Sequence, residues 1–349
     1  MIPSWLAFVV RRLATAAILL LLLTMVTFVA YWKIPNEPAA FLVDIRYATP
    51  EQIAHARHLL GVDRPLYVQY GRFVWRALHG DLGRTFTGAR TTGPSGAPVA
   101  GQVVHAAAVT GSIALGGALL LFVVSVPIGL LGASRPRSLA DRATAATSIV
   151  AISLHPLVVA LLLQLFVASR WHWLPQAGYC SLLPQAQPCS GPVGWAEHLL
   201  LPWVTFALFF VALYSRMIRA RLLEVLGEPY IRTARAKGVP ERLVLLRHAL
   251  PNTALPLVTM LAMDIGTAVG ICVYIEAVFR LPGLGLRTLI AMVGLGLDLP
   301  MLIGITLFTG AAIVVLNLIV DVVAVMLDPT ISRSPRGRTA LLHLAGRTG

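Results

Sequence analysis

The chain has 349 residues, of which 57% are hydrophobic and only 12% are charged, and its mean hydropathy is +0.78. Soluble domains are about 25% charged, so this composition excludes an ordinary soluble domain and indicates a polytopic all-α membrane protein. The net charge of +13 does not indicate a nucleic-acid partner, because the basic residues lie between apolar spans. The expected environment is a lipid bilayer.

Apolar runs of about 20 residues predict six transmembrane helices. The first run could be a signal peptide, but its apolar region exceeds the usual length of about 7–15 residues, which favours a retained helix. The fifth run carries two acidic residues, Asp264 and Glu276. In chain order, the six helices are expected within residues 13–32, 103–131, 143–169, 199–215, 251–279 and 300–327.

Basic residues gather in alternate short loops, which the positive-inside rule assigns to the cytoplasm. They follow the second, fourth and sixth expected helices, whereas the intervening loops carry few. Both termini are therefore expected in the cytoplasm, with residues 33–102 outside. The basic residues of the expected cytoplasmic segments are Arg135, Arg137, Arg142, Arg216, Arg219, Arg221, Arg232, Arg235, Lys237, Arg242, Arg247, Arg333, Arg336, Arg338 and Arg347.

The long loop after the first helix carries signals for two helices of its own. Thr49, Pro50 and Gln52 match an N-cap, a first helical position and the closing residue of a capping box. A second helix is expected to begin at residues 63–65 and to end at Gly80. The loop is thus predicted to be helical rather than irregular.

Two cysteines share the expected outer loop between the third and fourth helices. Cys180 and Cys189 are nine residues apart, and an oxidising exterior permits a disulfide between them. Closing so short a loop stabilises the fold by roughly 2–3 kcal/mol in the chain-entropy model. Cys272 lies within the fifth expected helix and is expected to be a packing residue.

Neither of the two lysines belongs to a nucleotide-binding loop. A P-loop needs Gly-Lys-Ser/Thr, because the lysine reaches the phosphates and the hydroxyl holds magnesium. Lys33 is followed by Ile34, and Lys237 by Gly238. The sequence also lacks metal-ligand spacings and catalytic signatures such as His-Glu-x-x-His. We expect no catalytic residue, no metal and no cofactor bound by this chain, so any ATP and Mg would be used by partner subunits.

A basic segment between the fourth and fifth helices carries the most specific pattern. Gly227 and Gly238 are expected to end helices, so residues 229–237 are predicted to form a short separate helix. Together with His248-Ala249-Leu250-Pro251, the segment resembles the cytoplasmic coupling loop of ABC-importer permeases, in its dipeptide/oligopeptide spelling. The residues that carry the resemblance, and the expected ATPase contact, are Tyr230, Arg232, Thr233, Ala234, Arg235, Ala236, Lys237 and Gly238.

The resemblance implies a type I ABC-importer permease in a bacterial plasma (inner) membrane. It implies a heterodimer with a second permease subunit, two ATPase subunits inside, and an extracytoplasmic substrate-binding protein. The expected organisation is an N-terminal helix and outer loop (1–100), a transmembrane domain (101–328) with a coupling loop (219–250), and a basic tail (329–349). This chain would form half of the translocation pathway and perform no bond chemistry.

Four residues of the fifth helix are candidates for pathway or interface roles. A carboxylate at mid-bilayer is costly, so Asp264 is expected either to face the cavity and a substrate cation, or to form a hydrogen bond between subunits or be a protonated buried acid. The segment from Glu276 to Pro282-Gly283-Leu284-Gly285 resembles the family's outer loop, which implies a role in lining the gate or docking the binding protein, or only a turn of fixed shape. Gly266 and Gly270 share one helical face, which permits close packing with a second permease or within the chain.

Other functions remain open at the level of the sequence. The same family transports nickel chelates, glutathione and some oligosaccharides, and no motif separates these from peptides. A secondary transporter driven by an ion gradient would need a coupling-ion site, for which Asp264 is a thin candidate.

Overall fold

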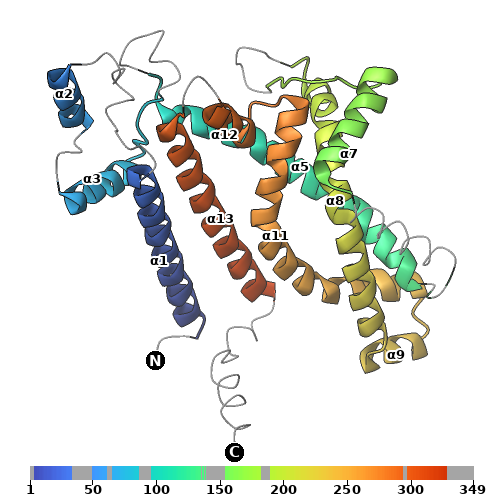
Figure 1. Cartoon of the computed structure of the whole chain (residues 1–349). Coiled ribbons are helices and arrows are strands. Elements are labelled where there is room, and N and C mark those ends of the chain that lie inside the picture. Colours follow the sequence, from blue (N-terminus) through green and yellow to red (C-terminus); the bar gives the residue numbers. More distant parts are fainter. Residues whose placement is uncertain are drawn as a thin grey trace, which may run out of the picture.

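The computed structural model describes residues 4–33, 49–60, 65–85, 96–134, 136, 138, 154–181, 189–293 and 297–327. Its regular structure is helical (Figure 1). The helices are α1 (Ser4–Lys33), α2 (Pro50–Leu60), α3 (Leu66–Leu78), α5 (Val99–Ser134), α7 (Pro156–Leu163), η2 (Gln164–Arg170), α8 (Pro192–Leu226), α9 (Pro229–Ala236), α10 (Glu241–Leu243), η3 (Val244–Ala249), α11 (Leu250–Phe279), α12 (Leu284–Val293) and α13 (Leu299–Leu327).

Four helices in the described part are long and apolar enough to cross a membrane: α5, α8, and the segments Val10–Ala30 of α1 and Leu299–Val323 of α13. A fifth span arises if α11 and α12 are taken together, although they are bent by 72° between Met263–Phe279 and Leu284–Val293. The chain is therefore a multi-pass, all-α membrane protein, as expected. The expected third span lies partly outside the described residues, so six spans stays a prediction.

The core lies between α5 and α8, because small residues on α5 admit large ones from α8. A Cβ added to Gly117 would lie 2.6 Å from the ring of Phe206, and one added to Gly129 would lie 2.6 Å from Ile218. The indole of Trp203 donates to the carbonyl of Ser112 at 2.9 Å. Small residues allow membrane helices to approach closely, which explains this pairing.

Three of the helices are several residues longer than the apolar pattern predicts. One is α1, which begins at Ser4 rather than at residue 13. α8 runs over Pro192–Leu226, beyond the expected 199–215, and α5 runs over Val99–Ser134, beyond 103–131. Hydropathy detects only the part inside the bilayer, whereas polar turns beyond it continue the same backbone hydrogen bonding. The extension of α8 is important because it carries the chain out to α9.

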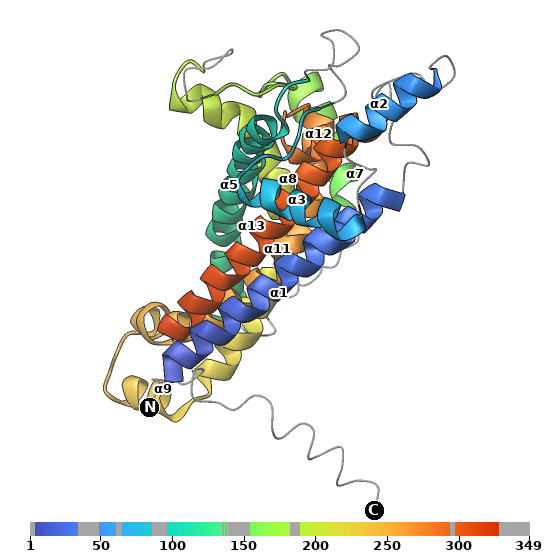
Figure 2. The same cartoon turned by 90° about the vertical axis from the view of Figure 1, so that its left-hand side faces the viewer.

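The N-terminal helix α1 packs along α13, the last helix (Figures 1 and 2). Arg12 Nη1 lies 2.7 Å from Asp321 Oδ2. A Cβ on Gly310 would come within 2.4 Å of Leu23, so this glycine permits the close approach of the two helices. Asp321 therefore joins α13 to α1.

The predicted features of the two loops expected outside, one after the first helix and one before the fourth, are present where the structure describes them. The backbone N–H of Gln52 donates to Thr49 Oγ1 at 3.3 Å, and that of Thr49 donates to Gln52 Oε1 at 3.0 Å, which confirms the capping box. α3 ends before Gly80, whose φ is +75°. Cys180 and Cys189 are joined by the predicted disulfide.

Candidate functional site

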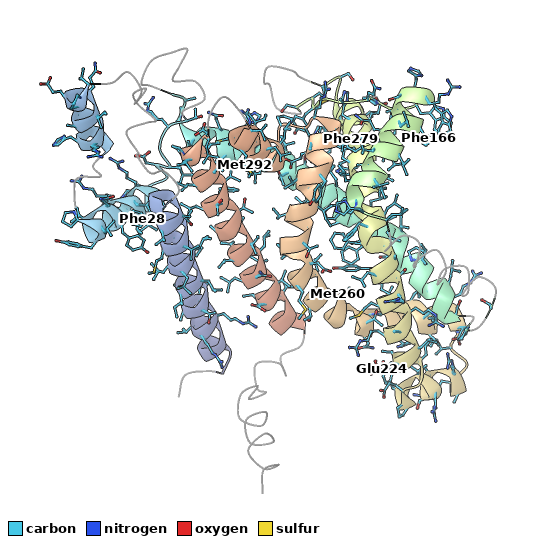
Figure 3. The ribbon with its side chains drawn as sticks, viewed as in Figure 1. Phe28, Phe166, Glu224, Met260, Phe279 and Met292 are labelled. Atoms are coloured by element: carbon cyan, nitrogen blue, oxygen red, sulfur yellow. A yellow bond between two sulfur atoms is a disulfide. The ribbon has the colours of Figure 1, made fainter. Side chains whose placement is uncertain are left out.

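The predicted coupling helix exists as α9, at the end of the molecule where α1 begins (Figures 1 and 2). α2 and α12 lie at the opposite end in both views. The last turns of α8 lead into α9, and Glu224, labelled in Figure 3, marks this region. The structure thus separates α9 from the body formed by the spanning helices.

Local sequence fixes both ends of α9. Pro229 occupies its first turn, where a missing N–H leaves no helical hydrogen bond unmade. At the other end, Gly238 adopts φ +78°. Its N–H donates to the carbonyl of Arg235 at 2.9 Å, and the N–H of Val239 donates to that of Ala234 at 3.3 Å. This pair of bonds is a Schellman motif, which ends the helix at the predicted glycine.

One side of α9 is anchored to the rest of the chain. Ile231 is fully buried in the main core cluster, together with Leu222 of α8 and Val244 of η3. The hydroxyl of Tyr230 accepts a hydrogen bond from Asn252 Nδ2, in the first turn of α11, at 3.1 Å. α9 therefore contacts the helices on either side of it, so a force applied to α9 would reach both α8 and α11.

A bidentate ion pair connects α9 with α10. Arg235 donates from Nε and Nη2 to the two carboxylate oxygens of Glu241, at 3.0 and 2.6 Å. Hydrogen bonding to Arg235, opposed by partial burial and aided by its charge, lowers the pKa of Glu241. The same bond raises the pKa of Arg235. The pair fixes the turn at Gly238 between the two helices.

The remaining surface of α9 is exposed and basic. Ala234 is half-buried, whereas the other predicted coupling residues lie on the surface. The exposed ones are Tyr230, Arg232, Thr233, Arg235, Ala236, Lys237 and Gly238. α9 therefore carries an apolar anchor on one side and cations on the other.

At the opposite end, Glu276 is fully buried and accepts hydrogen bonds with both carboxylate oxygens. Thr110 of α5 donates to Oε1 at 2.6 Å. The backbone N–H groups of Gly285 and Leu286 donate to Oε2 at 2.7 and 3.0 Å. The N–H of Leu284 in turn donates to Thr110 Oγ1 at 2.9 Å. The carboxylate therefore caps the first turn of α12. It accepts hydrogen bonds from N–H groups that have no partner within the helix, and its negative charge interacts favourably with the helix dipole.

The glycines beside this carboxylate are required by close packing. A Cβ on Gly283 would lie 2.3 Å from the carboxyl carbon of Glu276, and one on Gly285 would lie 2.4 Å from the Cα of Val273. The sequence predicted only a turn at Pro282-Gly283-Leu284-Gly285. The structure adds α12, a helix that is bent by 72° from the end of α11 after Arg280 adopts a left-handed conformation with φ +52°.

Asp264 lies on α11 and is bonded within the chain. The hydroxyl of Tyr214, on α8, donates to Asp264 Oδ2 at 3.0 Å. Tyr214 is fully buried and Asp264 is half-buried. At about 100° per residue, Asp264 falls between the side of α11 that packs on α8 and the exposed side that carries Met263 and Tyr274. The carboxylate is thus at the edge of an open surface.

Gly266 and Gly270 lie on that open side of α11. Both are exposed, and a Cβ added to either would meet no atom of the described chain within 4 Å. Nothing in the described part of the chain therefore uses these glycines for close packing.

The structure does not gather the predicted residues into one site. Asp264 and Glu276 are 12 residues apart on one helix, about 18 Å along its axis. Sequence reasoning missed Thr110, Tyr214, Asn252 and Glu241, which contact the predicted residues. Only Glu241 had a local signal, because it follows Gly238 and Pro240, residues that end one helix and can begin another.

Comparison with known proteins agrees with this arrangement. Residues 125–333 match the model of the binding-protein-dependent transport system inner membrane component, and residues 5–115 match that of its N-terminal region. A Brucella abortus (strain 2308) protein, provisionally named a peptide transport system permease protein, is 33% identical over 329 residues, covering 93% of this chain and 98% of the relative. The dipeptide transport system permease protein DppB of Escherichia coli K12 is 30% identical over 343 residues, with 93% and 98% covered.

The fold and the matches define an integral membrane permease component. The chain belongs to the family of binding-protein-dependent transport system inner membrane components, which confirms the resemblance read from the sequence.

Proposed function

We propose that this chain is the permease subunit of an ATP-driven importer of dipeptides or oligopeptides. The observation that carries the proposal is α9, a capped helix with a buried Ile231 and an exposed basic surface, in a chain of the importer family. The names of the relatives support peptides as the substrate. ATP and Mg are used by partner subunits, and this chain carries no catalysis.

In this proposal, α9 docks on an ATPase subunit. The exposed side of α9 carries Arg232 and Lys237, which suit an acidic groove, and its buried side contacts α8, η3 and α11. Movement of the ATPase pair is passed through these contacts to the spanning helices. The assembly contains a second permease subunit, two ATPase subunits and an extracytoplasmic substrate-binding protein.

The end of the molecule that carries α9 is assigned to the cytoplasm of a bacterial inner membrane. The positive-inside bias of the loops supports this orientation, and α1 begins at the same end as α9 (Figure 1). Both termini are then cytoplasmic. The segments 1–100, 101–328 and 329–349 act as an anchor with an outer loop, the transport domain and a basic tail.

The open side of α11 is assigned to the contact with the second permease and to the pathway between them. Gly266 and Gly270 are uncovered in this chain and leave room for a partner helix. Asp264 at the edge of this surface would meet a substrate cation or tune the pathway. Glu276 would act indirectly, because its oxygens hold α12 at the outer end of the pathway.

The test is uptake by the assembled transporter in proteoliposomes, with the binding protein outside and ATP inside. Radiolabelled dipeptides and oligopeptides should accumulate only with ATP, and a nickel chelate, glutathione or an oligosaccharide should not compete. Competition by one of these three compounds would show that the transported substrate belongs to that class instead. Uptake driven by an ion gradient without ATP would overturn the proposal in favour of a secondary transporter.

A further inference from the structure

α3 is an amphipathic helix with a large uncovered apolar surface. None of its residues is buried. Tyr67, Trp75 and Leu78 are exposed by 78, 65 and 77% of their surface, and Leu66 is exposed by 47%. Tyr67 and Leu78 project to nearly the same side, since their 11-residue separation is close to three helical turns. Such a surface, which the described part of the chain leaves exposed, requires an explanation.

The adjacent side of α3 packs across the upper part of α1 (Figures 1 and 3). Phe28, labelled in Figure 3, lies where the two helices meet, and its ring centroid is 5.4 Å from that of Tyr70 and 5.8 Å from that of Phe73. The hydroxyl of Tyr70 lies 3.0 Å from Thr24 Oγ1. These contacts fix both the height and the rotation of α3.

The height places α3 at the membrane boundary. Thr24 and Phe28 both belong to the candidate span Val10–Ala30, whereas α1 continues to Lys33. At about 1.5 Å per residue, Phe28 and Thr24 lie about 3–9 Å inside the end of that span. An interfacial helix buries its apolar face about 5–10 Å into the boundary of headgroups and acyl chains. If α3 lay in water outside the membrane, it would contact α1 beyond Ala30, where the candidate span ends.

The rotation agrees with this position. On α1, which α3 contacts, Met25, Val26 and Val29 of the candidate span are likewise exposed, by 56, 66 and 47% of their surface. Arg72 and Arg76 are also exposed, and at 100° per residue they lie on the opposite arc from Tyr67 and Leu78. Tyr and Trp favour the headgroup level, and cations on the polar face favour anionic headgroups.

We propose that α3 lies in the bilayer surface opposite α9 as an interfacial anchor, with Tyr67 and Leu78 in lipid and Arg72 and Arg76 toward water. Through Phe28 and Thr24, the anchor would hold α1, and with it α13, at a fixed depth. This anchor consists of α1 and α3 alone, so a test of it does not depend on which substrate is transported or on whether an ATPase docks on α9.

Nitroxide scanning of the assembled transporter in nanodiscs with anionic lipid tests this proposal. Single labels are placed at Leu78→Cys and Tyr67→Cys, with Arg72→Cys and Arg76→Cys as matched controls on the same helix. Cys272→Ala removes the buried free thiol, and the disulfide is left oxidised. Power saturation then compares collisions with oxygen, which enters lipid, and with a water-soluble nickel chelate.

Labels at positions 78 and 67 should favour oxygen over the nickel chelate severalfold more than labels at positions 72 and 76. Equal access of the nickel chelate to all four would overturn the proposal and point to a face in water, available to a binding protein. Exclusion of both reagents from positions 78 and 67 would also overturn it, because the face would then be covered by another subunit.

Discussion

Two short helices, α9 and α12, come before and after α11 in the chain, and different kinds of contact hold them in place. α9, before it, is attached by one buried aliphatic side chain and by polar contacts at the surface, with Ile231 and the Arg235–Glu241 pair as examples. α12, after it, is attached by a buried carboxylate, Glu276, whose bonds reach α5 as well. The outer surface of α9 is therefore free for a partner, whereas the position of α12 is set inside the chain.

The difference predicts which residues tolerate change. An exposed cation can be reversed with little effect on folding, because surface substitutions usually change stability by less than about 0.5 kcal/mol. A buried acceptor cannot be removed in the same way, because each unsatisfied donor costs about 1–3 kcal/mol. Substitutions of exposed residues at the α9 end should therefore change function without changing stability, whereas substitutions of the buried acceptor at the α12 end should change both.

The largest effect is expected for Glu276→Ala. The substitution removes the acceptor of Thr110, Gly285 and Leu286, and we expect a loss of about 3 kcal/mol or more. Thermal unfolding of the solubilised assembly measures it. Glu276→Gln is the matched control, because its amide oxygen still accepts from the two backbone N–H groups. Equal melting temperatures for wild type and Glu276→Ala would contradict the capping role.

Ile231→Ala should weaken the attachment of α9. Truncating a buried isoleucine costs about 2–5 kcal/mol, here concentrated between α9, α8 and η3. Peptide-stimulated ATP hydrolysis should fall because force no longer passes from α9 to the spanning helices. The measurement is ATPase activity with and without peptide, and Ala236→Ser on the exposed side is the control. Full stimulation in Ile231→Ala would show that this anchor is not needed for coupling.

A smaller effect is expected at the bond between α8 and α11. Tyr214→Phe removes a hydrogen bond worth about 1 kcal/mol and leaves the carboxylate of Asp264 in place, whereas Asp264→Asn removes its charge. If Asp264 serves the pathway, transport should change strongly in Asp264→Asn and only slightly in Tyr214→Phe, with assembly intact in both. Unchanged transport in Asp264→Asn would end the pathway role.

The smallest effect concerns pH at the turn after α9. Bonding to Arg235 lowers the pKa of Glu241, so the pair stabilises the turn above the ordinary glutamate pKa and is lost as pH falls through the lowered value. Because both groups are largely exposed, the contribution is at most about 1 kcal/mol. A nitroxide at Ala236→Cys should become more mobile in acid. In Glu241→Gln it should be mobile at every pH; a wild-type-like acid transition there would contradict the assignment.

The α9 end could be predicted from sequence because its determinants are local. Gly227, Pro229 and Gly238 mark the ends of the helix within a dozen residues, and the structure places a helix between them. The α12 end could not, because Glu276 bonds with Thr110, which is 166 residues away, and no pattern in an uncharged helix marks that threonine. Similarly, the partner of Asp264 is Tyr214 on another helix, 50 residues away.

The spans and the loops show the same difference between features set by local residues and features set by distant ones. The capping box at Thr49 and Gln52 is a local signal and was predicted correctly. The bend between α11 and α12 was predicted only as a turn, because the direction of α12 is set by the packing of Gly285 against Val273. Hydropathy also underestimated the length of α8, because the last turns of the helix lie beyond the apolar part of its sequence.

The docking of ATPase subunits on α9 is tested most directly by reversing its exposed charges. Arg232→Glu with Lys237→Glu is compared with Arg170→Glu, an exposed reversal in η2, by measuring how much ATPase subunit co-purifies with each assembly. We predict that the α9 variant loses most of its ATPase while its melting temperature is unchanged, and that the control retains it. Full retention of ATPase by the α9 variant would contradict a docking role for the basic surface of this helix.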